Sequence, residues 1–431
     1  MMLLVLFFVL LMLVAVGLPI LLSIGLVGLS GMLLAPDVNP ALFAQRIFSI
    51  VNSFSLLALP YFILAGAIMS KGGLARALVD FAQSLVGHVR GSLGHTSIIA
   101  CMGMANVSGS STAEAAAVGS IIIPSMKERG YRPGLAASIV ATAATIGPII
   151  PPSMTMIVYG AMTGVSIGGL FLAGIIPGIL LGLMMMTTVR ILAGLPRYPE
   201  LRKVDKRLGF RQILRAAAKA WAALLAPVII LGGIFSGIFT ATEAGIVACL
   251  YALFISVVFY RELGWKDLPR VVLDAAVTTA TVAGIIAMAG ALGWLLSYLD
   301  FNQLVLTGLR AVSTNEIVVL LVLLGIYILL TMFLESLAVL IIFVPIAAQV
   351  GQTFGYDPLH LGILFVVAAQ LGATTPPVAV LLLVTTSIAG ARFSETVREC
   401  IPFVLTLLLF LLVLVFAPIL TTWLPGQLMG R

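Results

Sequence analysis

The chain contains the same kind of helix break twice, 225 residues apart. Residues 130–152 read GYRPGLAASIVATAATIGPIIPP, and residues 355–377 read GYDPLHLGILFVVAAQLGATTPP. The Gly-Tyr pair, the proline that follows it, a later glycine and the closing Pro-Pro pair all match without a gap. Because proline lacks a backbone donor and clashes with the preceding turn, each apolar helix is expected to break at the same depth. The repeat therefore predicts two related halves.

The composition indicates whether these helices face water or lipid. Of the 431 residues, 61% are hydrophobic and 9% are charged, and the mean hydropathy is +1.21. A soluble fold cannot hide so much apolar surface, so the sequence predicts an all-α polytopic membrane protein. The cysteines and histidines are scattered, and we find no nucleotide-binding, zinc-protease or serine-hydrolase motif. We therefore expect no enzymatic activity and no cofactor, and any work must draw on an ion gradient.

The positive charges indicate which side of the membrane each loop faces. Basic residues concentrate in the cytoplasmic loops of membrane proteins. The surplus of seven positive charges is explained in this way without nucleic acid. The nine basic residues of 190–219 are interpreted as an orientation signal, with docking of a partner as the alternative. Twenty of the 23 Lys and Arg residues fall in five stretches predicted to be cytoplasmic, namely residues 71–90, 125–133, 190–219, 261–270 and 390–398.

About ten transmembrane helices, two re-entrant hairpins and two broken helices are predicted, arranged as an inverted repeat. Each hairpin joins two apolar arms of 14 residues. At ~1.5 Å per residue an arm reaches about 21 Å, too short for a hydrocarbon core of ~30 Å. Because each half crosses the membrane an odd number of times, the second half is inverted relative to the first. The charges agree, since the flanks of the second hairpin contain no Lys or Arg. That hairpin is therefore expected to enter from the outer side, where both termini are also placed.

The halves are predicted to have the following boundaries. Residues 37–52 are expected to form a polar loop, and residues 72–87 an amphipathic helix at the cytoplasmic interface. The first repeat spans residues 1–190, with a hairpin at about 92–128 and a broken helix at about 133–163; a basic cytoplasmic loop spans 191–221; the second repeat spans 222–431, with a hairpin at about 316–350 and a broken helix at about 358–388.

The hairpin tips and the breaks are the candidate ion sites. Irregular backbone at membrane depth is tolerated only where it is buried in protein or lines a cavity. Half-helix ends near the midplane are what secondary transporters use for substrate and coupling ion, and freed carbonyls and hydroxyls suit Na⁺. The alternative is a pair of proline kinks with small residues that pack helices closely. The candidate Na⁺ ligands are Asn106, Ser108, Gly147, Ile150 and Pro151 at the first site, and Thr331, Gly372, Thr374 and Thr375 at the second.

An anionic substrate group is expected where a hairpin arm begins. The amides of Ser110, Ser111 and Thr112, with Ser153 after the first break, are the candidates, because a helix N-terminus attracts negative charge. Two acidic residues lie near the tips, where a charge is costly. Glu114 follows Ser111 by three residues, which matches a capping box, with a proton or cation role as the alternative. For Glu335 the structural and functional roles stay open.

At these residues the chain resembles the large membrane subunit of tripartite ATP-independent periplasmic (TRAP) transporters, within the ion-transporter superfamily. The resemblance covers essentially the whole chain. It implies a Na⁺-coupled elevator in the bacterial inner membrane, in which hairpins and broken helices slide against the other spans. The resemblance also implies two partners, a separate small four-helix membrane subunit and a periplasmic binding protein that delivers a small organic acid. The motifs that carry it are SGSSTAEAAAVGSIIIPSMKERGY (108–131), IGPIIPPSM (146–154), SIGGLFLAGIIPG (166–178), PVIILGGIFSGIFTATEAG (227–245) and GATTPPVAVLL (372–382).

Three other functions compete with this interpretation. A stand-alone Na⁺- or H⁺-coupled carboxylate symporter of the same superfamily would need no binding protein. An intramembrane enzyme would need a nucleophile and base pair or a metal cluster, and the sequence suggests neither. A channel would need a continuous polar pore rather than paired tips that close from opposite faces.

Overall fold

A computed structural model of the chain describes residues 2–33 and 39–429, and these residues are helical with short connections. By length and composition, seven of the described helices could each cross a membrane, and the pair α4–α5, bent by 66°, could supply an eighth. The helices are α1 (Met2–Ala15), α2 (Ile20–Leu33), α3 (Pro40–Val51), α4 (Ala58–Lys71), α5 (Leu74–Val86), α6 (Ser92–Ser108), α7 (Ser111–Glu128), α8 (Pro133–Ala143), α9 (Met154–Thr163), α10 (Ile167–Gly194), α11 (Phe210–Phe235), α12 (Ala241–Phe254), α13 (Leu268–Tyr298), α14 (Phe301–Val312), α15 (Glu316–Phe333), α16 (Ser336–Phe354), α17 (Pro358–Thr374), α18 (Val380–Ala389), α19 (Phe393–Phe416) and α20 (Ile419–Met429).

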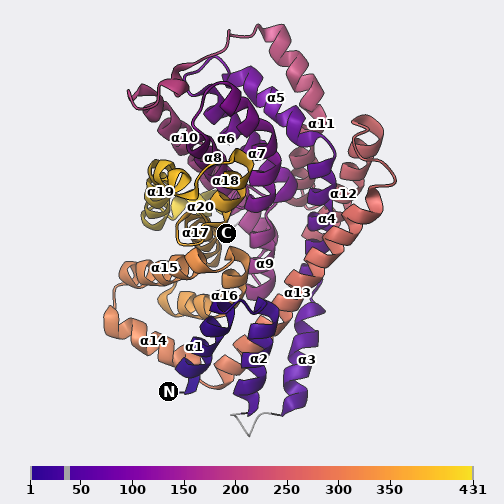
Figure 1. The fold of residues 1–431 in the computed structure, drawn as a ribbon. Helices are drawn as coiled ribbons and strands as arrows, with labels where there is room; N and C mark the ends of the chain where they lie inside the picture. The colour runs from indigo at the N-terminus through magenta and orange to yellow at the C-terminus, as the bar shows by residue number, and fades with distance from the viewer. Residues whose placement is uncertain (1, 34–38, 430–431) are drawn as a thin grey trace.

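The helices pack as two groups. The flanking bundle consists of α1–α4 and α11–α13, where α4 packs on α12 and the long helix α13 packs on α2, α3 and α4. The helical core consists of α6–α10 and α15–α20. Helices α5 and α14 connect the groups and lie at opposite ends of the molecule, as an inverted repeat would place them (Figure 1). The inversion itself remains a prediction.

Within the helical core the two halves of the sequence interlock. Helix α18 of the second half packs on α7 and α8 of the first, and α9 of the first half packs on α16 and α17 of the second. Each break therefore carries the chain from its own hairpin to the hairpin of the other half. Both proline pairs, Pro151–Pro152 and Pro376–Pro377, are joined by a cis peptide bond.

Three sequence expectations are corrected. The hairpin arms are 17 to 19 residues long rather than 14, because α6, α7, α15 and α16 continue almost to the tips. The polar loop expected at 37–52 is largely helix α3, whose N-terminus is capped by the Asn39 side chain, 2.9 Å from the Ala41 amide. The basic loop expected at 191–221 is shorter, since α10 continues to Gly194 and α11 begins at Phe210.

The basic stretches gather at one end of the molecule. Lys127 donates to the Ala389 carbonyl oxygen at 2.9 Å, which joins the second and fifth stretches. Arg129 pairs with Asp205 at 3.0 Å, which adds the third, and Lys71 lies 3.6 Å from Asp274, next to the fourth. This clustering at one end is the pattern that the positive-inside rule requires.

Candidate functional site

A cavity of about 80 Å³ lies where the two hairpin tips meet the two helix breaks. Each of the four irregular segments contributes to its wall, so the cavity is at the centre of the helical core. Polar side chains come from the hairpins and from the helices beside the breaks, and none of the lining side chains is cationic. The lining residues are Gly109, Ser110, Ser111, Thr112, Pro148, Met154, Thr155, Glu335, Ser336, Leu337, Gln370, Ala373, Val380 and Leu381.

The first tip lies directly against the first break. Gly109 has a positive φ of 55°, and a Cβ there would lie 2.6 Å from the Pro152 carbonyl oxygen and 3.0 Å from Ser153 Cα. Only glycine therefore allows this approach. One turn into α7, the carboxylate of Glu114 fills the space where a side chain at Gly147 would begin, and Glu114 is fully buried. The acidic side chain is thus held against the backbone of the break.

The second tip meets the second break through backbone and hydroxyl contacts. The side chain of Thr331 lies on Gly372, where a Cβ would come within 2.7 Å of Thr331 Cβ. The Val378 amide donates to the Met332 carbonyl oxygen at 3.2 Å, and Ser336 Oγ donates to the Ala369 carbonyl oxygen at 3.2 Å. In both halves a glycine of the break is therefore the surface that a hairpin side chain contacts.

Two helix breaks, two polar hairpin tips and a shared central cavity form the half-helix arrangement of secondary transporters. A family model described as "Tripartite ATP-independent periplasmic transporter, DctM component" matches residues 5–420. The chain belongs to this family. The central cavity is thus a feature of a transporter permease.

Curated relatives are similar in sequence to this chain along nearly its whole length. The chain is 39% identical over 407 residues to "C4-dicarboxylate TRAP transporter large permease protein DctM" of Pseudomonas aeruginosa, covering 94% of each chain. It is 36% identical to "2,3-diketo-L-gulonate TRAP transporter large permease protein YiaN" of Escherichia coli, again covering 94% of each. With "Sialic acid TRAP transporter large permease protein SiaM" of Vibrio cholerae it shares 34% identity over 96% of each chain.

A solved structure shares the fold. The YdaH transporter of Alcanivorax borkumensis superposes with a TM-score of 0.62 over 87% of both chains, at 16% sequence identity. At this identity the likeness concerns the arrangement of helices alone. It supports the interpretation of this DctM-family chain as a polytopic all-α membrane protein.

The predicted Na⁺ ligands of the DctM-family chain lie beside the two breaks. At the second site Thr331, Thr374 and Thr375 each donate to a carbonyl of their own helix, at 2.9, 3.0 and 2.6 Å. Because a hydroxyl that donates still has oxygen lone pairs, these groups fit a cation. At the first site Asn106 Nδ2 donates to the Met102 carbonyl oxygen at 3.1 Å, and Ile150 and Pro151 lie in the break. The side chain of Ser108 lies outside the described residues.

Of the residues predicted to bind substrate, three line the central cavity and one does not. Ser110, Ser111 and Thr112 line the cavity, and the hydroxyl oxygens of Ser110 and Thr112 lie 3.2 Å apart. Ser153 does not line it. Its side chain is fully buried and caps α9 by accepting the Met156 amide at 3.3 Å. The hydroxyl of Ser153 therefore serves the start of α9, and its role in substrate binding stays a prediction.

The structure places the two acidic residues differently. Helix α7 begins at Ser111 with Ser110 at the N-cap, so the capping box of Ser111 and Glu114 is wrong in its register. Glu335 is itself the N-cap of α16, and its carboxylate accepts the Ala338 amide at 2.9 Å. Glu335 also lines the cavity, so it combines a structural with a functional position.

Sequence reasoning did not identify several wall residues, of which Thr155, Ser336 and Gln370 are polar. Gln370 is 2% exposed, and its Oε1 has no hydrogen-bond partner among the described residues. It is the one amide side chain in the apolar run of α17, four residues before the break-site threonine Thr374. A buried amide at that spacing from a break was the signal available in the sequence.

A cluster of charges closes the end of the molecule where the basic stretches meet. The carboxylate of Glu399 on α19 accepts from Arg132 at 3.0 Å, from Arg197 at 3.2 Å and from the Tyr198 hydroxyl at 2.9 Å. Arg132 also pairs with Glu200 at 2.8 Å. Burial raises the pKa of Tyr198, and the hydrogen bond to Glu399 adds to that shift. The connection after α10 is therefore bonded to the N-cap residue of α8 and to α19.

The same connection is also fastened to α5, α6 and α7. The Gly91 amide donates to the Leu201 carbonyl oxygen at 2.6 Å, and the Asp205 amide donates to the Gly87 carbonyl oxygen at 2.9 Å. Asp205 accepts from both terminal nitrogens of Arg129 at 3.0 Å. Residues 195–205 thus run across the helical core and are bonded to it along their length.

Replacing Glu399 by alanine is expected to destabilise the protein by roughly 2 kcal/mol, because the buried Tyr198 hydroxyl loses its acceptor. The apparent melting temperature in detergent is the measurement. Glu395→Ala is the matched control one turn earlier on α19. Glu395 pairs with Arg392 at the surface, and 48% of its side chain is exposed, against 7% for Glu399. An exposed pair contributes little. Equal losses of melting temperature in the two variants would contradict a stabilising role for the buried Glu399 carboxylate.

Proposed function

We propose that the chain is the large permease subunit of a transporter that takes up a small organic acid across the bacterial inner membrane, coupled to Na⁺. The observation that carries the proposal is the central cavity, whose wall combines both hairpin tips with both helix breaks. The start of α7 supplies amides and hydroxyls for an anion, and the breaks supply carbonyls and hydroxyls for Na⁺. The acids printed in the names of the relatives support an organic acid as substrate.

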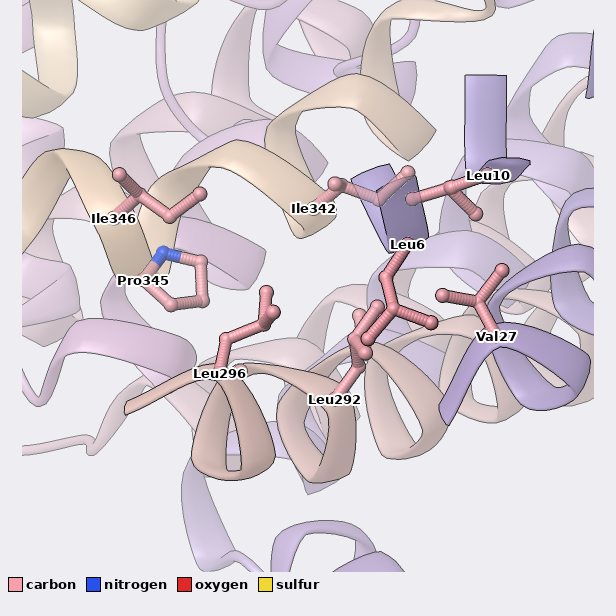
Figure 2. Close-up of a pocket in the computed structure, with 10 residues that line it drawn as sticks. Leu6, Leu10, Val27, Leu292, Leu296, Ile342, Pro345 and Ile346 are labelled. Atoms are coloured by element: carbon pink, nitrogen blue, oxygen red, sulfur yellow. The ribbon is translucent and has the colours of Figure 1, made fainter. Parts of the chain in front are cut away.

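The proposed mechanism is a movement of the helical core against the flanking bundle. Support comes from the interface between α13 and α16, where a cavity of about 20 Å³ has only aliphatic side chains and glycine on its wall. Figure 2 shows Leu292 and Leu296 of α13 facing Ile342, Pro345 and Ile346 of α16. Aliphatic contacts are not directional, so such a surface can slide without breaking hydrogen bonds.

A second cavity supports a route from the substrate site to the cytoplasm. It has a volume of about 270 Å³, lies between α4 and α13, and shares Ser110 and Met154 with the central cavity. Its other end carries Lys71 and Asp274, at the end of the molecule where the basic stretches gather. In this arrangement the central cavity communicates with the side predicted to be cytoplasmic.

The proposed partners are a small four-helix membrane subunit and a periplasmic binding protein. Support comes from the family description and from one relative, "Isethionate TRAP transporter permease protein DctMQ" of Oleidesulfovibrio alaskensis, which is 35% identical. The chain covers 64% of that relative, so the relative has additional sequence.

Uptake into proteoliposomes tests the proposal. The chain is reconstituted with its small subunit, and binding protein loaded with a radiolabelled organic acid is added outside, with or without an inward Na⁺ gradient. We expect uptake only with both the gradient and the binding protein. Uptake that does not depend on the binding protein would instead support the stand-alone symporter. Uptake that does not depend on Na⁺ would rule out the proposed ion sites.

A further inference from the structure

A cavity of about 570 Å³ lies at the end of the helical core where the basic stretches gather. Its wall is formed by the starts of α8 and α19 and by the connection after α10, and it shares no lining residue with the central cavity. The proposed function therefore assigns no role to it. The charged side chains in its wall are Arg132, Arg197, Arg398, Glu395 and Glu399.

The carboxylates around this basic cavity are all paired, whereas one guanidinium is not. Glu399 and Glu200 pair with arginines as described above, and Glu395 pairs with Arg392 at 3.0 Å. Within the described part of the chain, Arg398 has neither an ion pair nor a hydrogen bond, and its side chain is exposed. Four arginines thus surround three carboxylates, so one positive charge and the five N–H donors of Arg398 remain for an anion.

Neutral donors line the same wall. Ser394 contributes an exposed hydroxyl, and Gly134 and Leu135 belong to the first turn of α8. The first amides of a helix have no acceptor within that helix, and the helix dipole favours negative charge there. Guanidinium, hydroxyl and amide donors together match the oxygens of a phosphate group.

Helices α10 and α19 run from the basic cavity into the bilayer and present one exposed face. They lie side by side (Figure 1), and the hydroxyl oxygens of Thr188 and Thr406 are 2.6 Å apart. Nearer the cavity Arg197 pairs with Glu399, so residue numbers fall along one helix as they rise along the other. The two helices are therefore antiparallel, and side chains turned in the same sense from Thr188 and from Thr406 lie on the same side of the pair.

The exposed side chains on that side are aliphatic. On α19, Arg398 is followed at spacings of three and four residues by Ile401, Leu405 and Leu408, and all four are exposed. Such spacings place them in one row along the helix. On α10 the exposed Ile191 is turned to the same side. The row thus has a cationic end at the cavity and an aliphatic remainder, as an amphiphile with an anionic head requires.

We propose that an anionic phospholipid binds here, with its phosphate in the basic cavity at Arg398 and Ser394 and its acyl chains along the exposed face of α10 and α19. Basic pockets between helices on the cytoplasmic side of a membrane are suited to anionic head groups. The occupant is a lipid rather than free phosphate, because the aliphatic row continues directly from the basic wall. The site lies wholly on the helical core and goes beyond the proposed function.

Tryptophan quenching by brominated lipids tests the inference without any transport assay. Leu405→Trp permease is reconstituted in equal parts of phosphatidylglycerol and phosphatidylcholine, and in each sample only one of the two lipids carries bromine. Emission of the four native tryptophans is measured in wild type and subtracted. We expect phosphatidylglycerol to be enriched about fivefold at position 405. Leu250→Trp, at an exposed position on α12 of the flanking bundle, is the matched control and should be quenched equally by both lipids.

Two further changes locate the head group. In the Leu405→Trp chain, Arg398→Gln is expected to abolish the enrichment. Arg211→Gln removes the same charge at the start of α11, outside the cavity, and should leave the enrichment intact. Enrichment that survives Arg398→Gln, or equal enrichment at positions 405 and 250, would overturn the inference. Competition by inorganic phosphate would assign the cavity to free phosphate instead, and displacement of both lipids by the small subunit would assign the face to that subunit.

Discussion

Replacing Gly372 by alanine is expected to reduce Na⁺-driven uptake about 100-fold, because the second hairpin can no longer lie on the second break. The added Cβ would overlap Thr331 Oγ1 and would lie 2.7 Å from Thr331 Cβ and 3.0 Å from the Thr331 carbonyl carbon. Thr331 is buried and short, and one of these atoms is backbone, so no flexible side chain can move aside. The break and the tip must separate, and the proposed ion ligands separate with them.

Gly325→Ala is the matched control. Gly325 lies on α15 of the same hairpin, and a Cβ there would meet nothing within 4 Å. Alanine is also the better helix former, so this variant is expected to transport at the wild-type rate. The measurement is the initial uptake rate at equal amounts of reconstituted protein. Wild-type uptake by Gly372→Ala would show that the contact between tip and break is not required for transport.

A covalent link between α13 and α16 is expected to reduce uptake to background. Leu296 and Ile346 line the aliphatic interface between the flanking bundle and the helical core (Figure 2). Cysteines at these two positions, in a chain whose native cysteines are replaced, are joined by a short bifunctional thiosulfonate. If the core moves against the bundle during each cycle, the link stops the cycle, and reduction with dithiothreitol restores it. Uptake before linking, after linking and after reduction is the measurement.

The control pair lies in the wall of the same cavity. Leu6 of α1 and Val27 of α2 both belong to the flanking bundle. Cysteines at these positions, linked by the same reagent, join two helices that are not required to move relative to each other. Uptake should therefore persist. Undiminished uptake by the linked Leu296–Ile346 pair would exclude a sliding movement at this interface.

The sequence specified the breaks well and the lengths of the arms poorly. A proline pair removes two backbone hydrogen-bond donors in any fold, so α17 had to end near Thr374. The predicted arms end at the first polar residue. In the structure Asn106 and Thr331 donate to carbonyls of their own helices, at 3.1 and 2.9 Å, so both helices continue past them. A polar side chain that bonds to its own helix does not end that helix.

The central cavity could be predicted only in part. Ser110–Thr112 was readable because a short polar run between two apolar arms has to form a tip. Gln370 was not assigned, because its place in the cavity wall depends on contacts between distant segments, such as the bond from Ser336 to Ala369. Helix α14 was also missed, since a helix of 12 amphipathic residues is too short for a transmembrane pattern.

The fastening of residues 195–205 limits how far the helical core can travel. Beyond Asp205 the chain has no regular structure until α11 begins at Phe210, in the flanking bundle. Five peptide units join these two residues, and fully extended they reach about 18 Å. This segment is therefore a tether of fixed length. It limits the distance that the helical core can move relative to α11, unless the first turn of α11 unwinds.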